Sequence, residues 1–527
     1  MIMTRIFRLP QRYTMRGIIR SKSGSLSTET SPTTCIPNGM VLSGLAKTSR
    51  NDSPLQTQKM RRFRGATPAG GIDRLTGPDL SGFVPDRFGW PAQIGLIAVF
   101  DGDRLFDDDG RRLRLDDLRD QIVGRLHLTP RLRQVVSRLR LGLGGPIWVD
   151  AQTFNIIDHV KAHVLPAGAG LIELLGACEE LRQLPLDPSR PLWELWLLPG
   201  LPGSQVGMFA RLHHSIADGP AGVTLLSNLL DHSPDTAASW PWRPGPPPSS
   251  RDLVLDNVYR RVVAVAQASR RLLHPMKMLA TLRQSWPLVQ EFFGDQRTAH
   301  TSLNAPIGRT RQMAVVTGSL SAVKAASRAT GATVNDAVLA CVAGGLRELL
   351  QSRGERVAGV ILRAMVPVTL QDPELGRARG NQYGNMVVPL PIGEADTIRR
   401  LQYIAAQTAT RKRRTRPAWG TGVFGSPLMQ RLTLPMARRQ HVINVHVANV
   451  PGPRDALYLA GARVATAFPL VPLTGNLTIG IGVLSYIDQL NITVVADKER
   501  CPDLAQFTGG LNVAMHALDS RSVAIYR

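Results

Sequence analysis

An alternating strand pattern that ends on two histidines constrains this chain more than any other feature. Apolar residues occupy every second position from Val206 to Leu212, a spacing that is typical of a strand with one buried face. Two histidines follow at once, in the string HHSIADG at residues 213–219, and a helical pattern over 221–230 comes next. The chain therefore places two imidazoles where a strand gives way to a helix.

A neutral imidazole at such a position is suited to take a proton. Its pKa lies near ~6.5, so the free base is present at neutral pH. Successive strand residues point to opposite faces, so we expect His214 on the face of Leu212 and His213 on the other. Diverging rings make a shared metal site awkward, and we predict no metal centre. General-base catalysis fits the pair, and so does one core histidine beside one solvent-exposed histidine.

The charge balance limits the partners of the chain. Its 527 residues include 63 Lys and Arg against 40 Asp and Glu, a net charge of +23. Nucleic acid, an anionic membrane surface and a polyanionic small molecule such as coenzyme A all fit that excess. Aromatic residues make up only 5%, and no zinc-finger, RNA-recognition or leucine-zipper pattern occurs. We therefore expect no nucleic-acid partner.

Cysteines and apolar runs bear on location. The four cysteines are far apart and form no C-x-x-C pair, which favours reduced thiols and a cytoplasmic protein. No stretch reaches ~18 consecutive apolar residues, so we predict no transmembrane helix. Lipid contact would then be peripheral, with an anionic membrane or a lipid droplet. The basic run at 411–416 is a candidate for that contact, or else the solvated end of a helix.

Composition divides the chain into four segments. Residues 1–65 are basic and poor in acids, which fits a disordered tail, a transit peptide or a start codon assigned too early. Residues 72–232 and 301–527 each mix strands and helices and predict two lobes. Residues 233–300 begin with a proline-rich stretch and continue as a helical one, so we interpret them as a linker and crossover.

The periodicity within the lobes predicts individual elements. We expect strands at 93–100, 192–198, 205–213, 313–320, 360–367, 386–391, 442–447, 477–485 and 490–496. We expect helices at 115–126, 221–230, 322–328, 334–352 and 397–411. The strands at 192–198 and 205–213 flank a Pro- and Gly-rich connection and predict a hairpin.

The string HHSIADG resembles the H-H-x-x-x-D-G motif of the wax ester synthase/diacylglycerol acyltransferase (WS/DGAT) family. Other blocks resemble this family in the expected order: RLTGPD at 74–79, LDPSRPLWE at 186–194, LNAPIG at 303–308, TVND at 333–336, VPV at 366–368, GN at 380–381, NVPGP at 449–453 and SY at 485–486. The resemblance covers about 72–525. It departs at Gln93, where the family often has His, and at Gln371, where it often has Arg.

The resemblance implies a two-lobe α/β fold like that of chloramphenicol acetyltransferase, with mixed sheets and the active site between the lobes. It implies that His214 is the general base and that His213 supports the site. Asp218 would orient the loop through charge pairing, and Gly219 would supply a backbone conformation closed to other residues.

The block at 333–336 adds two further site candidates. Asn335 and Asp336 are candidate substrate-binding or oxyanion residues at a helix N-terminus. The spacing Thr333-x-x-Asp336 fits a capping box equally well, and a capping box only starts a helix.

The activity implied by the resemblance is transfer of a long-chain acyl group from acyl-CoA to a lipid hydroxyl. Diacylglycerol, giving triacylglycerol, is the first choice of acceptor, and a long-chain fatty alcohol, giving a wax ester, is the second. Acyl-CoA is a substrate, and no cofactor is required. A non-catalytic lipid-surface protein with the same fold is the alternative from another class. The sequence leaves the acyl chain length and the oligomeric state open.

Overall fold

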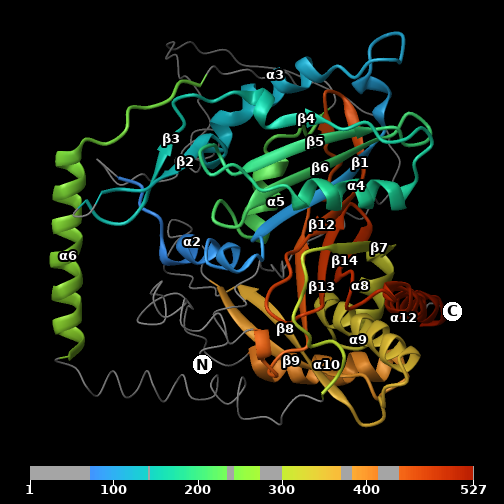
Figure 1. Ribbon diagram of the computed structural model, residues 1–527. Coiled ribbons are helices and arrows are strands. Elements are labelled where there is room, and N and C mark those ends of the chain that lie inside the picture. The colour runs from blue at the N-terminus through green and yellow to red at the C-terminus, as the bar shows by residue number, and fades with distance from the viewer. Residues whose placement is uncertain are drawn as a thin grey trace, which may run out of the picture. The chain divides into compact units, whose positions relative to one another are not determined.

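The computed structural model describes residues 72–140, 143–233, 242–272, 300–369, 383–412 and 438–525. These residues form a mixed α/β architecture around two six-stranded sheets (Figure 1). The first sheet has the order β11-β12-β1-β6-β5-β4, with strands at Tyr458–Leu459, Ala462–Leu470, Gln93–Phe100, Val206–His213, Trp193–Pro199 and Val160–Ala162. The second has the order β7-β14-β13-β10-β8-β9, with strands at Arg311–Ser319, Gln489–Asp497, Ile479–Tyr486, Val445–Pro451, Ile361–Thr369 and Tyr383–Pro391.

Helices and one small strand pair complete the described part of the chain. The pair is β2 at Gln134–Ser137 and β3 at Ile147–Asp150. The α-helices are α2 at Gly77–Gly82, α3 at Leu115–Arg125, α4 at Leu171–Gln183, α5 at Gly219–Ser227, α6 at Ser250–Leu272, α8 at Leu320–Ala329, α9 at Val334–Ser352, α10 at Thr397–Lys412 and α12 at Leu504–Ile525. A short 3-10 turn at Pro85–Phe88 follows α2.

The two sheets are interleaved along the chain. Strands β11 and β12 come from the 301–527 segment, yet they complete the first sheet. β12 pairs with β1 in antiparallel register, with Leu470 opposite Gly95, and it also contacts β13 and β14. The expected boundary at 300/301 therefore divides stretches of chain, and it does not divide the sheets.

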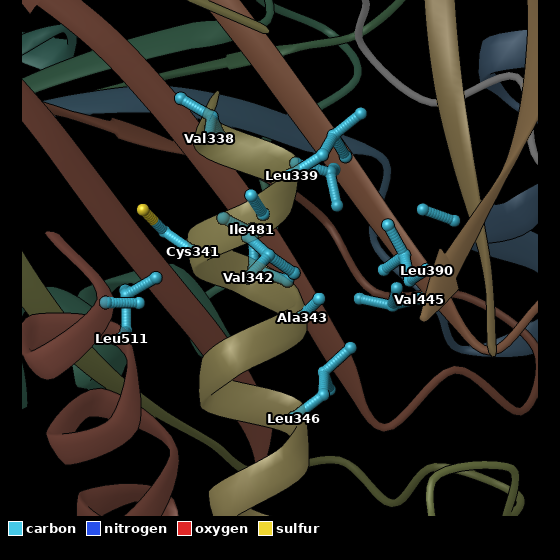
Figure 2. Packing of buried hydrophobic residues seen from close by; sticks show 14 of the residues in the cluster. Val338, Leu339, Cys341, Val342, Ala343, Leu346, Leu390, Val445, Ile481 and Leu511 are labelled. Atoms are coloured by element: carbon cyan, nitrogen blue, oxygen red, sulfur yellow. The ribbon is translucent and has the colours of Figure 1, made fainter. Parts of the chain in front are cut away.

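Helix α9 forms the centre of the largest apolar cluster (Figure 2). Its sequence is apolar almost all round, a pattern that predicts full burial. In Figure 2, Val338, Leu339 and Val342 lie near side chains of β9, β10 and β13, and Leu511 approaches from α12. The second sheet is thus covered by a helix that is itself enclosed.

Most of the predicted elements are confirmed. Strand β1 and helix α9 have the predicted bounds, and β5 and β6 pair as the predicted hairpin, with Glu194 opposite Arg211. The strand predicted at 442–447 is shifted toward the C-terminus and lies at Val445–Pro451. β10 extends through Pro451, because Asn449 and Val450 continue a parallel ladder with β13.

Several predicted features lie outside the described residues. These are the basic segment at 1–65, residues 234–241 of the proline-rich stretch, the second half of the helical crossover, Gln371, residues 380–381, and 413–416 of the basic run. Within the described ranges, no single helix combines the length and apolar character needed to cross a membrane.

Candidate active site

The motif at 213–219 is a strand, a tight turn and a helix start. β6 ends at His213, and α5 begins at Gly219. Asp218 is the N-cap of α5, and its carboxylate accepts a hydrogen bond from the backbone N–H of Ala221 at 3.0 Å. Pro220 fits the first turn, where its missing N–H has no helical acceptor. The predicted succession of strand, histidines and helix is confirmed.

Two of the roles carried over to this motif are corrected. Gly219 is a helical residue and is not among the described glycines with positive φ, so the special backbone conformation expected there was wrong. No ion pair between described residues involves Asp218, whose hydrogen bond caps the helix. Capping, in place of the expected charge pairing, ties the loop to α5.

His213 is held on both of its ring nitrogens. Its Nε2 lies 2.8 Å from the Oδ2 atom of Asp86, and its Nδ1 lies 2.7 Å from the Ser215 hydroxyl. The backbone N–H of Ser215 also donates to Nδ1, at 3.1 Å. Nδ1 is therefore an acceptor, which assigns the ring proton to Nε2 and makes it the donor to Asp86. The buried ring also stacks on Phe83, with centroids 4.5 Å apart.

His214 sits one residue beyond the strand, in the turn. Its backbone N–H donates to the carbonyl of Ala92 at 2.8 Å, which anchors the turn to the start of β1. Its ring is half-buried, and the Nε2 atom has almost no solvent-accessible surface. The two histidines thus differ in burial, since His213 is buried and His214 is half-buried.

Asp86 is a site residue that the sequence argument missed. Its Oδ2 atom contacts His213, while its Oδ1 accepts from the backbone N–H of Ala92 at 2.8 Å. Because Ala92 in turn holds the backbone of His214, one carboxylate is linked to both histidines. No spacing signal connects Asp86 to residues 127 positions away, so only the folded chain shows this link.

A buried arginine supports the strand that ends in the motif. Arg211 pairs with Glu194 at 2.6 Å and donates to the carbonyl of Leu184 at 2.6 Å. Burial would raise the pKa of Glu194, but hydrogen bonds from Lys161 and the adjacent charge of Arg211 hold it below its usual value. The pair was also missed, although the predicted hairpin register places an acid opposite a base. Gln93, the noted departure, lies opposite His213 in the ladder.

Asp218 is an acid held in an apolar setting. Its side chain is buried, and burial raises its pKa to about 6. The hydrogen bond from Ala221 opposes this rise but does not cancel it. A carboxyl that titrates so close to neutrality, four residues after the candidate base in the chain, is a common feature of functional sites.

Asn335 and Asp336 are buried at the start of α9. The capping box predicted for Thr333 and Asp336 is confirmed, with the Thr333 backbone N–H donating to Asp336 at 2.9 Å. The other carboxylate oxygen of Asp336 accepts from the Thr408 hydroxyl at 2.8 Å, which ties α9 to α10. The hydrogen bonds described for Asp336 do not reach the turn that carries the histidines.

A narrow apolar slot runs beside the motif. It has a volume of about 30 Å³ and an almost wholly apolar lining. Leu212 and Gly219 line it from the motif, and Val450 and Gly482 line it from the second sheet. His214 is not among the described lining residues; Leu212, two residues before it, and Gly219, five residues after it, are. A Cβ at Gly222, which also lines it, would meet only the Ile94 Cδ1 atom, at 3.1 Å.

The position of this slot agrees with a site between the lobes, since both sheets contribute to its walls. Across the described ranges, no cluster of three or more His, Cys, Asp or Glu residues could hold a metal ion.

Comparison with known families decides where the chain belongs. The description "Wax ester synthase/diacylglycerol acyltransferase catalytic domain" matches residues 75–338, and "WS/DGAT C-terminal domain" matches residues 379–519. The chain belongs to the WS/DGAT family. This WS/DGAT chain is 30% identical over 455 residues to "Probable diacyglycerol O-acyltransferase tgs1" of Mycobacterium tuberculosis, covering 81% of this chain and 90% of that relative.

Solved structures place the WS/DGAT chain in the two-lobe fold class that was predicted. The wax ester synthase/diacylglycerol acyltransferase of Marinobacter aquaeolei VT8 matches with a TM-score of 0.61 and 21% identity, covering 86% of this chain and 100% of that one. The first condensation domain of the CDA synthetase matches with a TM-score of 0.51 and 15% identity, covering 85% and 96%. The chain is therefore an acyltransferase-family protein with the expected chloramphenicol-acetyltransferase-like architecture.

Proposed function

We propose that this WS/DGAT chain transfers a long-chain acyl group from acyl-CoA to the hydroxyl of diacylglycerol, with His214 as the general base. The relative from M. tuberculosis is named as a diacylglycerol O-acyltransferase, which supports this acceptor over a fatty alcohol. The family description covers both acceptors, so a wax ester is the product that the acceptor test must separate.

The observation that carries the base assignment is the difference between the two histidines. Both ring nitrogens of His213 are engaged, one by Asp86 and the other by Ser215. A ring that donates from one nitrogen and accepts at the other is held in place, and it is poorly suited to collect a substrate proton. His214 is the remaining imidazole of the motif, and its own backbone is fixed by Ala92.

The chemistry requires only a proton shuttle at His214. The imidazole takes the acceptor hydroxyl proton as the oxygen attacks the thioester carbonyl carbon. The tetrahedral oxyanion then collapses, the carbon–sulfur bond breaks, and the thiolate of coenzyme A leaves. The protonated imidazole returns the proton to this thiolate, so the ester, free coenzyme A and the original base are the products.

Burial of the Nε2 atom supports transfer to an alcohol over transfer to water. An acceptor that approaches through the protein interior meets the base without bulk solvent, which disfavours hydrolysis of the thioester. The apolar slot next to Leu212 and Gly219 offers a surface suited to a hydrocarbon chain. It would have to widen for such a chain, because its present volume suits about one water molecule.

The test is a product-resolved assay with the purified full chain. We expect oleoyl-CoA to esterify diacylglycerol in preference to monoacylglycerol and hexadecanol. His214→Ala should lower kcat by roughly 10²–10⁴-fold, the range for loss of a general base. His516→Ala, at an exposed histidine on α12, is the matched control and should keep full activity.

Circular dichroism and a thermal melt show whether each variant is folded. A folded His214→Ala protein with normal kcat would overturn the base assignment. A wild-type protein that binds lipid but forms none of the three esters would point to the non-catalytic alternative. Hexadecyl oleate as the main product would replace diacylglycerol with a fatty alcohol.

We further propose that the chain works at a lipid surface, since diacylglycerol is held in membranes and droplets. The surplus of basic residues in the chain favours an anionic surface.

A further inference from the structure

Helix α6 has an unusual distribution of apolar side chains. It is a single helix from Ser250 to Leu272, drawn as one unbroken coil in Figure 1. The large apolar residues Val254, Leu255, Val258, Tyr259, Val262 and Val265 are between 42% and 69% exposed. In a protein surrounded by water, a helix normally packs such residues against the core. The exposed apolar side of α6 is therefore a candidate surface for binding another molecule.

These residues form one continuous stripe. At about 100° per residue, positions 254, 255, 258, 259, 262 and 265 fall within an arc of about 140°. Helix α6 packs against the rest of the protein through a different side. Leu253 is buried against Ile72 and Ile147, and Asp256 pairs with Arg74 at 2.5 Å. The face that carries the stripe is therefore not the face by which α6 is docked.

Charge selects the kind of partner. Arg261 is exposed and lies about 20° outside Val254, at one edge of the stripe, and Arg270 and Arg271 follow toward the end of α6. Arg260 lies on the docked side, where it pairs with Asp256. From 257 to 272 the helix contains no acidic residue, and Asp256 is paired with Arg74 and Arg260. An apolar stripe bordered by arginines is the pattern of a helix that lies in the interface of an anionic bilayer.

We propose that α6 lies flat on an anionic lipid membrane, with the stripe from Val254 to Val265 inserted at the headgroup boundary. This deepens the lipid-surface part of the proposed function by naming the element in contact, and it does not depend on the acyl-transfer chemistry. Docked in this way, α6 would hold the protein on the surface in which a lipid acceptor resides.

A second copy of the chain is the competing occupant, and the sequence argues against it. Leu255, Val258, Val262 and Val265 do recur with coiled-coil spacing. The positions flanking that seam are Val254, Arg261 and Ala268 on one side and Tyr259 and Ala266 on the other. Those positions lack the complementary charges that specify a helix pair, and they broaden the apolar face beyond a two-stranded seam.

Vesicle flotation of the full chain, without acyl-CoA, tests the proposal. The probes are phosphatidylcholine vesicles with and without a third of phosphatidylglycerol. We expect binding to the anionic vesicles. The double variant V258D/V262D should lose at least roughly tenfold in partitioning, because two carboxylates replace valines that insert into the membrane in the proposed complex. Val513→Asp is the matched control, since Val513 is an exposed valine on α12, and it should float as wild type does.

A second measurement does not depend on the aspartate variants. Cys178, Cys341 and Cys501 are buried, so Val262→Cys in a Cys35→Ser background can carry an environment-sensitive dye. We expect a blue shift on anionic vesicles at position 262 and none for Val513→Cys in the same background. Arg261→Gln should weaken binding by about fivefold at low salt.

Three results would overturn the proposal. They are wild type that stays off anionic vesicles, V258D/V262D that floats as well as wild type, and a dye at 262 that reports no change. Conversion of a dimer to a monomer by V258D/V262D, seen by light scattering, would assign the stripe to a second copy. Activity on dihexanoylglycerol, a dispersed acceptor, should be unchanged in V258D/V262D, while esterification of vesicle-borne dioleoylglycerol falls. Loss of activity on both acceptors would instead concern the catalytic site.

Discussion

Helices α5 and α9 begin in the same way but are held very differently. Each starts at a capping side chain within a family motif, Asp218 for α5 and Thr333 for α9. In α9, the carboxylate of Asp336 bonds back to Thr333 and reaches across to Thr408. In α5, the described hydrogen bond of the Asp218 side chain is the capping bond alone.

Packing follows the same division. Most of α9 is buried in the largest apolar cluster, and a Cβ at its Gly345 would lie 2.7 Å from the Phe507 carbonyl oxygen. Helix α5 lines a slot, and a Cβ at Gly222 would meet only the tip of Ile94. Helix α9 is therefore a tightly packed support, whereas α5 has unfilled space beside it, next to the motif that carries the two histidines.

The largest expected difference concerns the charge of Asp218. Its pKa in the folded chain is raised to about 6, above the ordinary value of 3.8 for an aspartate in water. The folded state therefore binds the proton more tightly, and stability is expected to fall as pH rises from about 4 to about 6, by up to about 3 kcal/mol. Asp218→Asn keeps a capping oxygen without the charge, so it should lack this slope.

Urea unfolding of wild type and Asp218→Asn at pH 4.5, 5.5 and 7.5 measures the effect. The two proteins should be similar at the lowest pH, and the variant should be the more stable at the highest. Asp218→Ala is the control for the cap, and it should cost about 1 kcal/mol relative to Asp218→Asn. Parallel curves for wild type and Asp218→Asn would show that the carboxylate is stabilised by a charge.

Asp336 should matter for stability far more than for catalysis. Asp336→Ala leaves the backbone N–H of Thr333 without its acceptor and removes the buried bond to Thr408. We expect a loss of about 2–3 kcal/mol in the free energy of unfolding, with kcat close to that of wild type in the protein that is folded. Thr408→Val removes only the link to α10 and should cost about 1 kcal/mol. A stable Asp336→Ala protein with strongly reduced kcat would restore the role of Asp336 at the active site.

Adding one methyl group to each helix tests the packing difference. Gly345→Ala would press a Cβ against a backbone oxygen, so we expect destabilisation by about 2 kcal/mol. Gly222→Ala meets a flexible side-chain tip, and the better helix propensity of Ala offsets that contact, so its stability should lie within about 0.5 kcal/mol of wild type. Thermal unfolding of the wild type and both variants under the same conditions measures the two changes in stability. Equal losses would mean that α5 is packed as tightly as α9.

The strands and helices around the motif could be predicted from the sequence, because each of them depends on the spacing of residues that are close together in the chain. Period-two apolar spacing and the hairpin connection gave β5 and β6, and the apolar run of α9 gave its bounds. The capping box was equally visible, since it spans three residues. These elements depend on neighbours in the chain, so a single sequence contains enough information to find them.

Interactions between distant segments were beyond that argument. Strand β12 pairs with β1, which lies near the other end of the chain. The apolar spacing within β12 can predict a strand, but it does not indicate which strand will pair with it. Asp86 was missed for the same reason. Gly219 was misjudged because a motif glycine was taken to need positive φ, whereas in the structure it is the first residue of α5 and lines the slot.

The smallest expected effect tests whether Asp86 positions the histidines. Asp86→Asn keeps one oxygen, which can accept from the Nε2–H of His213, but its NH2 group then faces the Ala92 N–H, and the charge on a side chain that is 37% exposed is lost. We expect kcat to fall by roughly threefold to tenfold with KM unchanged, because solvent screens the lost charge. Asp86→Ala removes both acceptor oxygens, and with them the carboxylate's link to the His214 turn, so it should lower kcat further. If Asp86 had only a structural role, Asp86→Ala would lower the unfolding midpoint and leave kcat unchanged. If Asp86 positions the histidines, the variant should lower kcat and leave the unfolding midpoint unchanged. The unfilled space beside α5 makes the second outcome the expected one, since a turn next to a yielding helix depends on Asp86 to stay in place.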